Sequence, residues 1–462
     1  MTDARRLLAP LALAQFICSF AGSNMNVMIN DISQDLDTTV KGVQTTITLF
    51  LLIMAILMIP GSKLTDRWGR KRCFMAGLIL YGVGALLSAA SPGLGVLILG
   101  NSVFEGVGTA LLIPPVYILT TMVFLDITSR ARAFGIISGA GGVGAAAGPL
   151  IGGVITSAIS WRAAFVFQAM IIVAIVLLSR RLRDPVAADP TRTFDVTGAV
   201  LSGAGMFFLV LGILQADVNV PLLVVFMALG AGFLLWFFLH VRAWEHAGKE
   251  PLLSRALFRN RMSNLGLVTQ NVQWLLLMGI SFTVSVFLQT VRDFNAIKTG
   301  VIFTATTAGI LVSSLAAERL ARRYAQRTLI RTGFVVTIAG IGLLLGFVSQ
   351  SHNGFAFVPG LLTIGLGVGV MLTPSVNVVQ SAFPESQQGE ISGLSRSVSN
   401  LGSSLGTAIA GTILVSDLAS GNRTYVIAMC ALTVFALAGL AAAWRLPGSA
   451  TIPAGAAAEA SA

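Results

Sequence analysis

Charged residues are scarce in this chain, and their scarcity indicates whether the chain folds in water or in a lipid membrane. Asp, Glu, Lys and Arg make up 11% of the 462 residues, whereas an ordinary soluble domain carries roughly 25%. Hydrophobic residues reach 55%, and the mean hydropathy is +0.84. A chain so poor in charge cannot keep a folded surface in water, so we predict an all-α integral membrane protein.

Cysteine and histidine are also rare, which excludes several kinds of site. The three cysteines and three histidines lie at unrelated positions, so we expect no disulfide bridge, no metal centre and no cofactor. The segment Gly139–Gly144 has the glycine spacing of a dinucleotide site but lacks the preceding strand that such a site needs. No nucleophile and base stand in a recognisable arrangement, so an enzyme is not expected.

The net charge of +11 comes from cations in short loops between apolar runs. A nucleic-acid partner would need them on one face of a soluble domain, so we expect none. The loops rich in Lys and Arg alternate with poor ones, and they comprise positions 5–6, 63–72, 130–132, 180–192, 242–261, 319–331 and 445. Because Lys and Arg stay in the cytoplasm during insertion, we predict a multi-pass protein of the cell membrane with both termini cytoplasmic.

Apolar runs of about 20 residues predict fourteen membrane-spanning helices in the order six, two and six. We expect them near Leu8–Asn30, Thr45–Pro60, Cys73–Ala90, Leu94–Phe124, Phe134–Ser157, Ala163–Leu178, Thr197–Gln215, Pro221–His240, Leu265–Gln289, Gly300–Leu315, Ile330–Val348, Phe355–Val379, Leu394–Val415 and Val426–Trp444. This order predicts an N-terminal six-helix bundle over residues 1–184, two extra helices with linkers over 185–261, a C-terminal six-helix bundle over 262–446 and a disordered tail over 447–462.

A basic loop, Gly61–Arg72, follows the second expected span and contains one acid, Asp66. An acid among cations can bind a neighbouring arginine and a helix N-terminus, forming a latch that opens when two bundles rock apart. Membrane topology alone would explain the cations but not the acid or the glycines. The loop resembles the signature of the major facilitator superfamily between its second and third helices. That resemblance implies a cytoplasmic gating role for Gly61, Asp66, Arg67, Gly69, Arg70 and Lys71.

The fifth expected span is rich in glycine. Three glycines recur at every fourth residue and therefore share one helix face, which lets a neighbouring helix approach closely. Ordinary packing of small residues would also explain them. The full spacing resembles the antiporter signature of drug exporters in the superfamily, which implies export, and it is formed by Gly135, Gly144, Gly148, Pro149, Gly152 and Gly153.

Two ionisable side chains stand out within the spans. Glu105 lies in the middle of the fourth span with Asn101 one turn away, and a carboxyl group buried there could bind a proton near neutral pH and release it to water. A purely architectural role in interhelical hydrogen bonding is an equal alternative. Glu390 near Arg396 is a second candidate for proton coupling, although Arg396 could simply extend to the membrane interface.

Polar side chains cluster in a few spans, where they could line a central cavity. Interhelical hydrogen bonding explains any single one of them equally well. The cavity candidates are Asn24, Asn26, Asn30, Asn101, Gln270, Asn271, Gln273, Trp274, Asn377, Gln380 and Arg396.

Nearly the whole chain resembles the fourteen-span drug:proton antiporter family. The resemblance implies a monomer in membrane lipid that exports small lipophilic compounds, such as drugs or dyes, in exchange for protons by alternating access. Ala21 lies where the family's first helix usually has an acid, Ser102 and Glu105 replace its usual Arg and Gln, and Ser399 occupies a common Arg position. We therefore expect the proton carrier to have moved to Glu105. The alternatives are a metabolite or lipid carrier or uniporter without proton coupling, and a non-transporting membrane ligand sensor.

Overall fold

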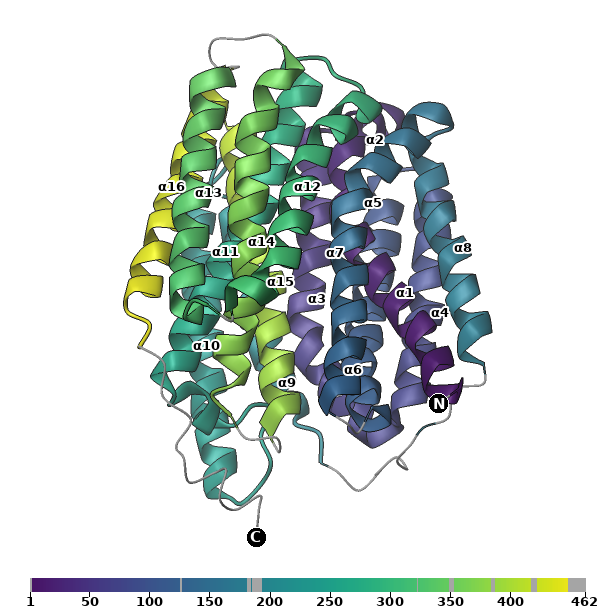
Figure 1. Ribbon diagram of the computed structural model, residues 1–462, viewed down its shortest axis with the longest axis vertical. Helices are drawn as coiled ribbons and strands as arrows, with labels where there is room; N and C mark the ends of the chain where they lie inside the picture. The colour runs from purple at the N-terminus through teal and green to yellow at the C-terminus, as the bar shows by residue number, and fades with distance from the viewer. Residues whose placement is uncertain are drawn as a thin grey trace.

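The fold is a bundle of long helices that lie roughly parallel (Figure 1). The structure is a computed structural model that describes residues 2–124, 127–180, 184, 193–321, 323–348, 353–383, 387–416 and 422–447. Within these residues the regular structure is entirely helical. Among the described residues, thirteen helices are long and apolar enough to cross a membrane, and a bent pair, Gly139–Ala145 and Ala147–Ala158, raises the number to fourteen if it forms one span. The expected all-helical membrane fold of about fourteen spans is therefore confirmed.

We call the helices of the first six spans the first half. They are α1 (Thr2–Asn24), η1 (Met25–Met28), α2 (Ile29–Asp35), α3 (Val40–Trp68), α4 (Arg70–Ala89), α5 (Leu94–Leu97), η2 (Ile98–Glu105), α6 (Gly106–Val123), α7 (Ile127–Ala158) and α8 (Trp161–Ser179). Two further spans follow, α9 (Val196–Leu214) and α10 (Val220–His246).

We call the helices of the last six spans the second half. After η3 (Arg255–Phe258) come α11 (Arg261–Val286), η4 (Phe287–Val291), α12 (Ala296–Ala321), α13 (Gln326–Val348), η5 (Gly354–Phe357), α14 (Val358–Gln380), α15 (Gln388–Val415) and α16 (Asn422–Trp444). The start of α1 and the end of α16 lie at the same end of the bundle, which we call the lower end after its place in Figure 1.

The basic segment after the second span is helical, which corrects the loop expected there. The second span was expected to end at Pro60, but α3 continues to Trp68 and α4 begins at Arg70. Pro60 is tolerated inside the helix because neighbouring groups in a membrane protein can satisfy the freed backbone. The turn consists of Gly69 alone, whose φ of +96° suits a residue without a Cβ.

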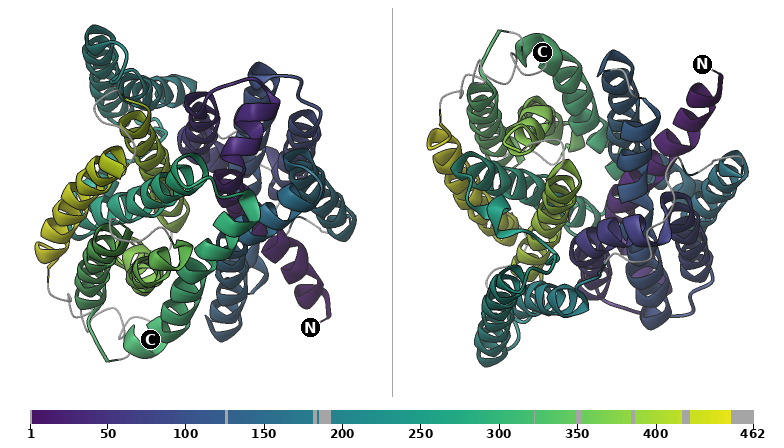
Figure 2. Two further views of the ribbon diagram at one scale, coloured as in Figure 1. Left: turned by 90° about the horizontal axis from the view of Figure 1, so that it is seen from above. Right: turned by 90° about the horizontal axis from the view of Figure 1, so that it is seen from below.

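The two halves meet along a seam made by two helix pairs, α3 with α15 and α7 with α12. The views along the bundle axis show these pairs between the purple-to-blue and green-to-yellow parts of the molecule (Figure 2). A hydrophobic core of buried side chains continues through both halves. The seam is where the halves would have to move relative to each other, so it positions the candidate site.

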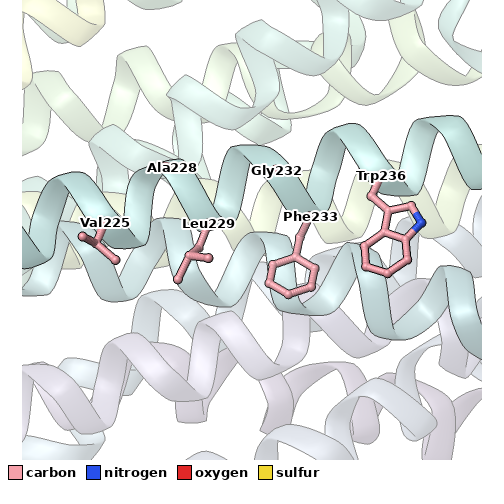
Figure 3. A pocket seen from close by; sticks show the side chains of 6 residues that line it. All are labelled: Val225, Ala228, Leu229, Gly232, Phe233 and Trp236. Atoms are coloured by element: carbon pink, nitrogen blue, oxygen red, sulfur yellow. The ribbon is translucent and has the colours of Figure 1, made fainter.

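The α9–α10 pair lies outside this seam. α9 packs on both α3 and α15, and α10 packs on α9 (Figure 2). The pair is fixed at both ends by acids: Asp217 binds Lys41 at 2.7 Å, and the buried Asp195 binds the ring of His240 at 2.8 Å. The exposed face of α10 carries an apolar groove, which suits contact with membrane lipid, and its lining is Val225, Ala228, Leu229, Gly232, Phe233 and Trp236 (Figure 3).

Candidate transport pathway

Buried polar contacts join α3 and α15 along the length of the seam. Gln44 Nε2 donates to the carbonyl of Ala408 at 3.1 Å, and Ser404 Oγ donates to the carbonyl of Thr48 at 3.0 Å. Further down, Ser397 Oγ donates to the carbonyl of Ala55 at 2.5 Å. Each bond runs from a side chain to a backbone carbonyl, and a hydroxyl or amide can pass from one carbonyl to the next as helices shift.

At the upper end the halves are joined by the side chain of Gln289. Its Nε2 donates to the carbonyl of Asn26 at 2.9 Å, and its Oε1 accepts from the backbone N–H of Asn30 at 3.0 Å. Ser285 Oγ also donates to the Asn26 carbonyl. The 3₁₀ turn η1 interrupts the first span here, and such a break changes the internal pairing of backbone groups. Asn26 and Asn30 therefore reach the second half through their backbone atoms.

At the lower end an ion pair joins α3 to α15. The Lys63 ammonium contacts the Glu390 carboxylate, and each side chain is 25% exposed. The sequence placed Glu390 near Arg396, but the structure gives each of them a separate partner on the first half. Lys63 belongs to the segment Gly61–Arg72, for which a gating role was expected. This segment therefore contacts the second half through the Lys63 ammonium group.

The other residues of the gating segment act within the first half or lie outside the described contacts. The Lys71 backbone N–H donates to Asp184 at 3.2 Å, and its ammonium donates to the carbonyl of Arg180 at 3.3 Å, so the start of α4 is tied to the end of α8. Arg70 is buried and Arg67 is partly buried. The side chain of Asp66, the expected latch, lies outside the described residues.

Above the ion pair, Arg396 of α15 reaches Tyr117 of α6. Its guanidinium donates to the Tyr117 hydroxyl and lies 4.7 Å from the centre of the ring. The Tyr117 hydroxyl in turn donates to Gln15 Oε1 of α1 at 3.2 Å. Arg396 and Tyr117 are only partly buried. A cation, a phenol and an amide from three helices and both halves therefore meet at the seam.

The glycine pattern of α7 packs against backbone on two sides. A Cβ at Gly144 would lie 2.2 Å from the Phe16 carbonyl oxygen of α1, and Gly148 and Gly152 face the same helix. Gly153 faces the other half, where a Cβ would lie 2.5 Å from the carbonyl oxygen of Ala296. Pro149 presents its carbonyl to Gly300 of α12. The surroundings of Gly135 lie outside the described residues. The pattern thus holds α7 against α1 and α12 at once.

Glu105 lies within the first half and is fully buried. Ser88 Oγ donates to its Oε1 at 3.5 Å, and Asn101 Nδ2 donates to its Oε2 at 3.4 Å. Within the described residues these partners are all neutral. Glu105 ends the π-helical turn η2, a rare form that often marks functional sites. The carboxyl group can therefore exchange a proton without leaving a partner charge unpaired.

The predicted amides of the second half are mostly hydrogen-bonded to other helices of that half. Gln270 accepts from Ser395 at 2.9 Å, and Gln273 accepts from Ser375 at 2.9 Å. For these the packing alternative accounts for the contacts. Asn271 and Gln380 also bond α15, through the Val398 carbonyl at 2.9 Å and Ser392 at 3.3 Å. Trp274 packs on the core, and Asn377 is exposed. In the first half, Asn24 is buried, and its amide nitrogen has no hydrogen-bond partner among the described residues.

Comparison with known proteins now decides the family. The sequence model described as the Major Facilitator Superfamily matches residues 11–407. The chain belongs to this superfamily. Members are integral membrane transporters of small molecules. The many apolar helices and the seam between the two halves are therefore parts of a transporter.

Relatives of this superfamily member include resistance and efflux proteins. It is 28% identical to the puromycin resistance protein of Streptomyces alboniger, over 88% of this chain and 81% of the relative. It is 27% identical to a multidrug efflux pump of Mycolicibacterium smegmatis, over 88% and 80% of the two chains. It is also 24% identical to a riboflavin transporter of Clostridioides difficile, over 90% of each.

Three residues of this superfamily member differ from the fourteen-span pattern, and each of them is uncharged and packed within the bundle. Ala21 is buried. Ser102 donates to the Thr46 carbonyl of α3 at 2.7 Å, and Ser399 donates to the Ser395 carbonyl of its own helix at 2.9 Å. None of the three supplies a charge. Glu105 lies near the middle of the span Leu94–Thr120, and Arg396 lies toward the lower end of the span Glu390–Val415.

The sequence did not single out several residues of the seam, namely Gln15, Gln44, Tyr117, Ser285 and Gln289. All five are polar side chains within apolar runs, which was the available signal. Their partners lie more than a hundred residues away along the chain or are backbone atoms. Such contacts depend on how the helices face each other, which composition does not reveal.

Proposed function

We propose that this transporter exports small lipophilic compounds from the cell in exchange for protons, by alternating access to one central pathway. The observation that carries the proposal is the pair of polar closures at opposite ends of one seam, Gln289 at the upper end and Lys63–Glu390 at the lower end. Either closure can open while the other holds if the halves rock about the α3–α15 and α7–α12 contacts.

The direction of transport rests on two supports. The glycine pattern of α7 resembles that of drug exporters, and several relatives are named as resistance, efflux or export proteins. The positive-inside pattern supports a plasma-membrane protein whose lower end and termini face the cytoplasm. Lys63–Glu390 is then the cytoplasmic closure, and the protein acts as a monomer surrounded by lipid.

We assign proton coupling to Glu105. It is fully buried and has neutral hydrogen-bond partners among the described residues, and Ala21 stands where the family's first helix usually has an acid. One proton that moves down the membrane potential supplies about 2.3 kcal/mol per 100 mV. One exchanged proton per cycle can therefore drive useful accumulation outside the cell.

The test of the function is dye efflux from energised cells that lack their own pumps. We expect cells that express the protein to lose a lipophilic dye faster than cells with empty vector, and an uncoupler to remove the difference. Efflux that persists unchanged with the uncoupler would contradict proton exchange. A protein that binds dyes but moves none in proteoliposomes would be the ligand sensor instead.

A metabolite carrier is the second candidate function. Ala21 in place of the usual first-helix acid and the 24% identity to a riboflavin transporter favour it. Such a carrier would move its compound in either direction along the concentration gradient. In proteoliposomes without a pH gradient we expect the exporter to show no accumulation, whereas gradient-independent net uptake of riboflavin would support the carrier.

A further inference from the structure

Glu105 and Arg396 are charged side chains inside the described spans, and they have different surroundings. Glu105 is fully enclosed by the first half, whereas Arg396 is partly exposed at the seam between the halves. Arg396 also contacts a residue of the opposite half. It is therefore a cation that a molecule in the seam could meet.

The described partners of Arg396 are neutral. Its guanidinium donates to the Tyr117 hydroxyl and lies over the Tyr117 ring. The acid nearest to it on α15, Glu390, is paired with Lys63. An arginine carries five N–H donors in a planar fork, and the described contacts use one side of that fork.

A cation in a poorly hydrated site without a counter-charge has lost favourable hydration free energy, and a bound anion compensates for much of this loss. The fork matches a carboxylate bidentately, the Tyr117 ring offers a face for an aromatic skeleton, and Gln15 offers an amide beside it. We propose that Arg396 is the anion-recognising residue of the pathway, and that preferred substrates are apolar, aromatic molecules that carry a carboxylate. This inference rests on the proposed export function and names its substrate class.

Binding of such a molecule has a consequence for the seam. A carboxylate that binds two nitrogens of the fork, one of them Nη2, competes with the Tyr117 hydroxyl there, so the α15–α6 link across the seam is released when substrate arrives. Recognition and the opening of one inter-half contact then occur in the same step.

The test uses purified protein in lipid nanodiscs and a panel of matched pairs, each an aromatic carboxylic acid of one to four fused rings and its carboxamide. We expect the acids to bind about tenfold to a hundredfold more tightly than the amides. Arg396→Gln should remove this preference, and Arg396→Lys should retain part of it. Arg423→Gln, which removes an exposed cation at the start of α16, is the matched control and should leave the preference unchanged.

Tyr117→Phe provides a second, independent measurement. Because it frees the guanidinium and keeps the ring, acid affinity should be equal to or higher than that of the unmodified protein. Acids that bind no better than amides, or a preference that survives in Arg396→Gln, would overturn the inference. If dye efflux is intact in that case, only the substrate class fails, whereas loss of all uncoupler-sensitive efflux is failure of the proposed function itself.

Discussion

Gly153 of α7 and Ala296 of α12 meet backbone to backbone across the seam, where a Cβ on Gly153 would lie 2.5 Å from the Ala296 carbonyl oxygen. Earlier on α7, a Cβ on Gly144 would lie 2.2 Å from the Phe16 carbonyl oxygen of α1. Glycine is thus required on two sides of one helix. The same helix contacts its own half and the opposite half, so its position affects both.

The first prediction concerns this close approach. Gly153→Ala should force α7 and α12 apart, reduce transport strongly and lower the free energy of unfolding by about 1–3 kcal/mol. Gly142→Ala on the same helix is the matched control, because nothing lies within 4 Å of its Cβ position. Dye efflux and unfolding in sodium dodecyl sulfate measure both effects. Equal results for the two variants would show that the packing at Gly153 is not limiting.

The second prediction concerns the ion pair at the lower end. Lys63 and Glu390 are each 25% exposed, so their interaction should contribute under about 1 kcal/mol to stability. Its larger effect should be on the balance between the two closures. Lys63→Glu and Glu390→Lys should each slow transport, and the double reversal should restore much of the rate. If the double variant is no faster than either single one, the pair does not act as a closure.

The third prediction concerns the upper end. Gln289→Ala removes the side chain that bonds both Asn26 and Asn30, so this end should open more often. A cysteine placed at Asn30 should then react faster with a membrane-impermeant thiol reagent added outside the cell. Gln34→Ala, which removes an exposed side chain one turn further along the same helix, is the control and should leave the labelling rate unchanged. Unaltered labelling in Gln289→Ala would contradict a closure at this position.

The fourth prediction concerns Asp195, which holds three segments together. Its carboxylate accepts from Gly198 N–H at the start of α9, from the His240 ring and from Leu252 N–H in the linker. Asp195→Ala should lower the free energy of unfolding by about 1–3 kcal/mol, since it removes a helix cap and leaves buried donors unpaired. Ser160→Ala, an ordinary cap at the start of α8, should cost less. A smaller loss for Asp195→Ala than for Ser160→Ala would refute this account of the linker.

The fold was largely predictable from the sequence because the lipid requirement acts on each span separately. Every expected span coincides with a helix or with a chain of helices. The ends were less predictable: Pro60 was expected to end a helix that continues to Trp68, because tertiary contacts override a proline inside a membrane span. Likewise no glycine or proline marks Met25–Met28, where the first span changes to a 3₁₀ turn.

The candidate site was predictable in its residue types but not in its partners. Glu105 with Asn101 was recognised because the two lie one turn apart on one helix. Arg396 with Tyr117, and Lys63 with Glu390, join residues that are hundreds of positions apart. Their pairing depends on the register between helices of different halves, about which a single sequence carries no local signal.

The fifth prediction tests the central claim, that Glu105 exchanges the proton that drives export. In proteoliposomes with an imposed pH gradient, Glu105→Gln should abolish uphill accumulation of dye while leaving gradient-independent exchange of labelled for unlabelled dye. Ser88→Ala, which removes one neutral partner of the carboxyl group, should lower but not abolish accumulation. Full gradient-driven accumulation by correctly folded Glu105→Gln would contradict the claim.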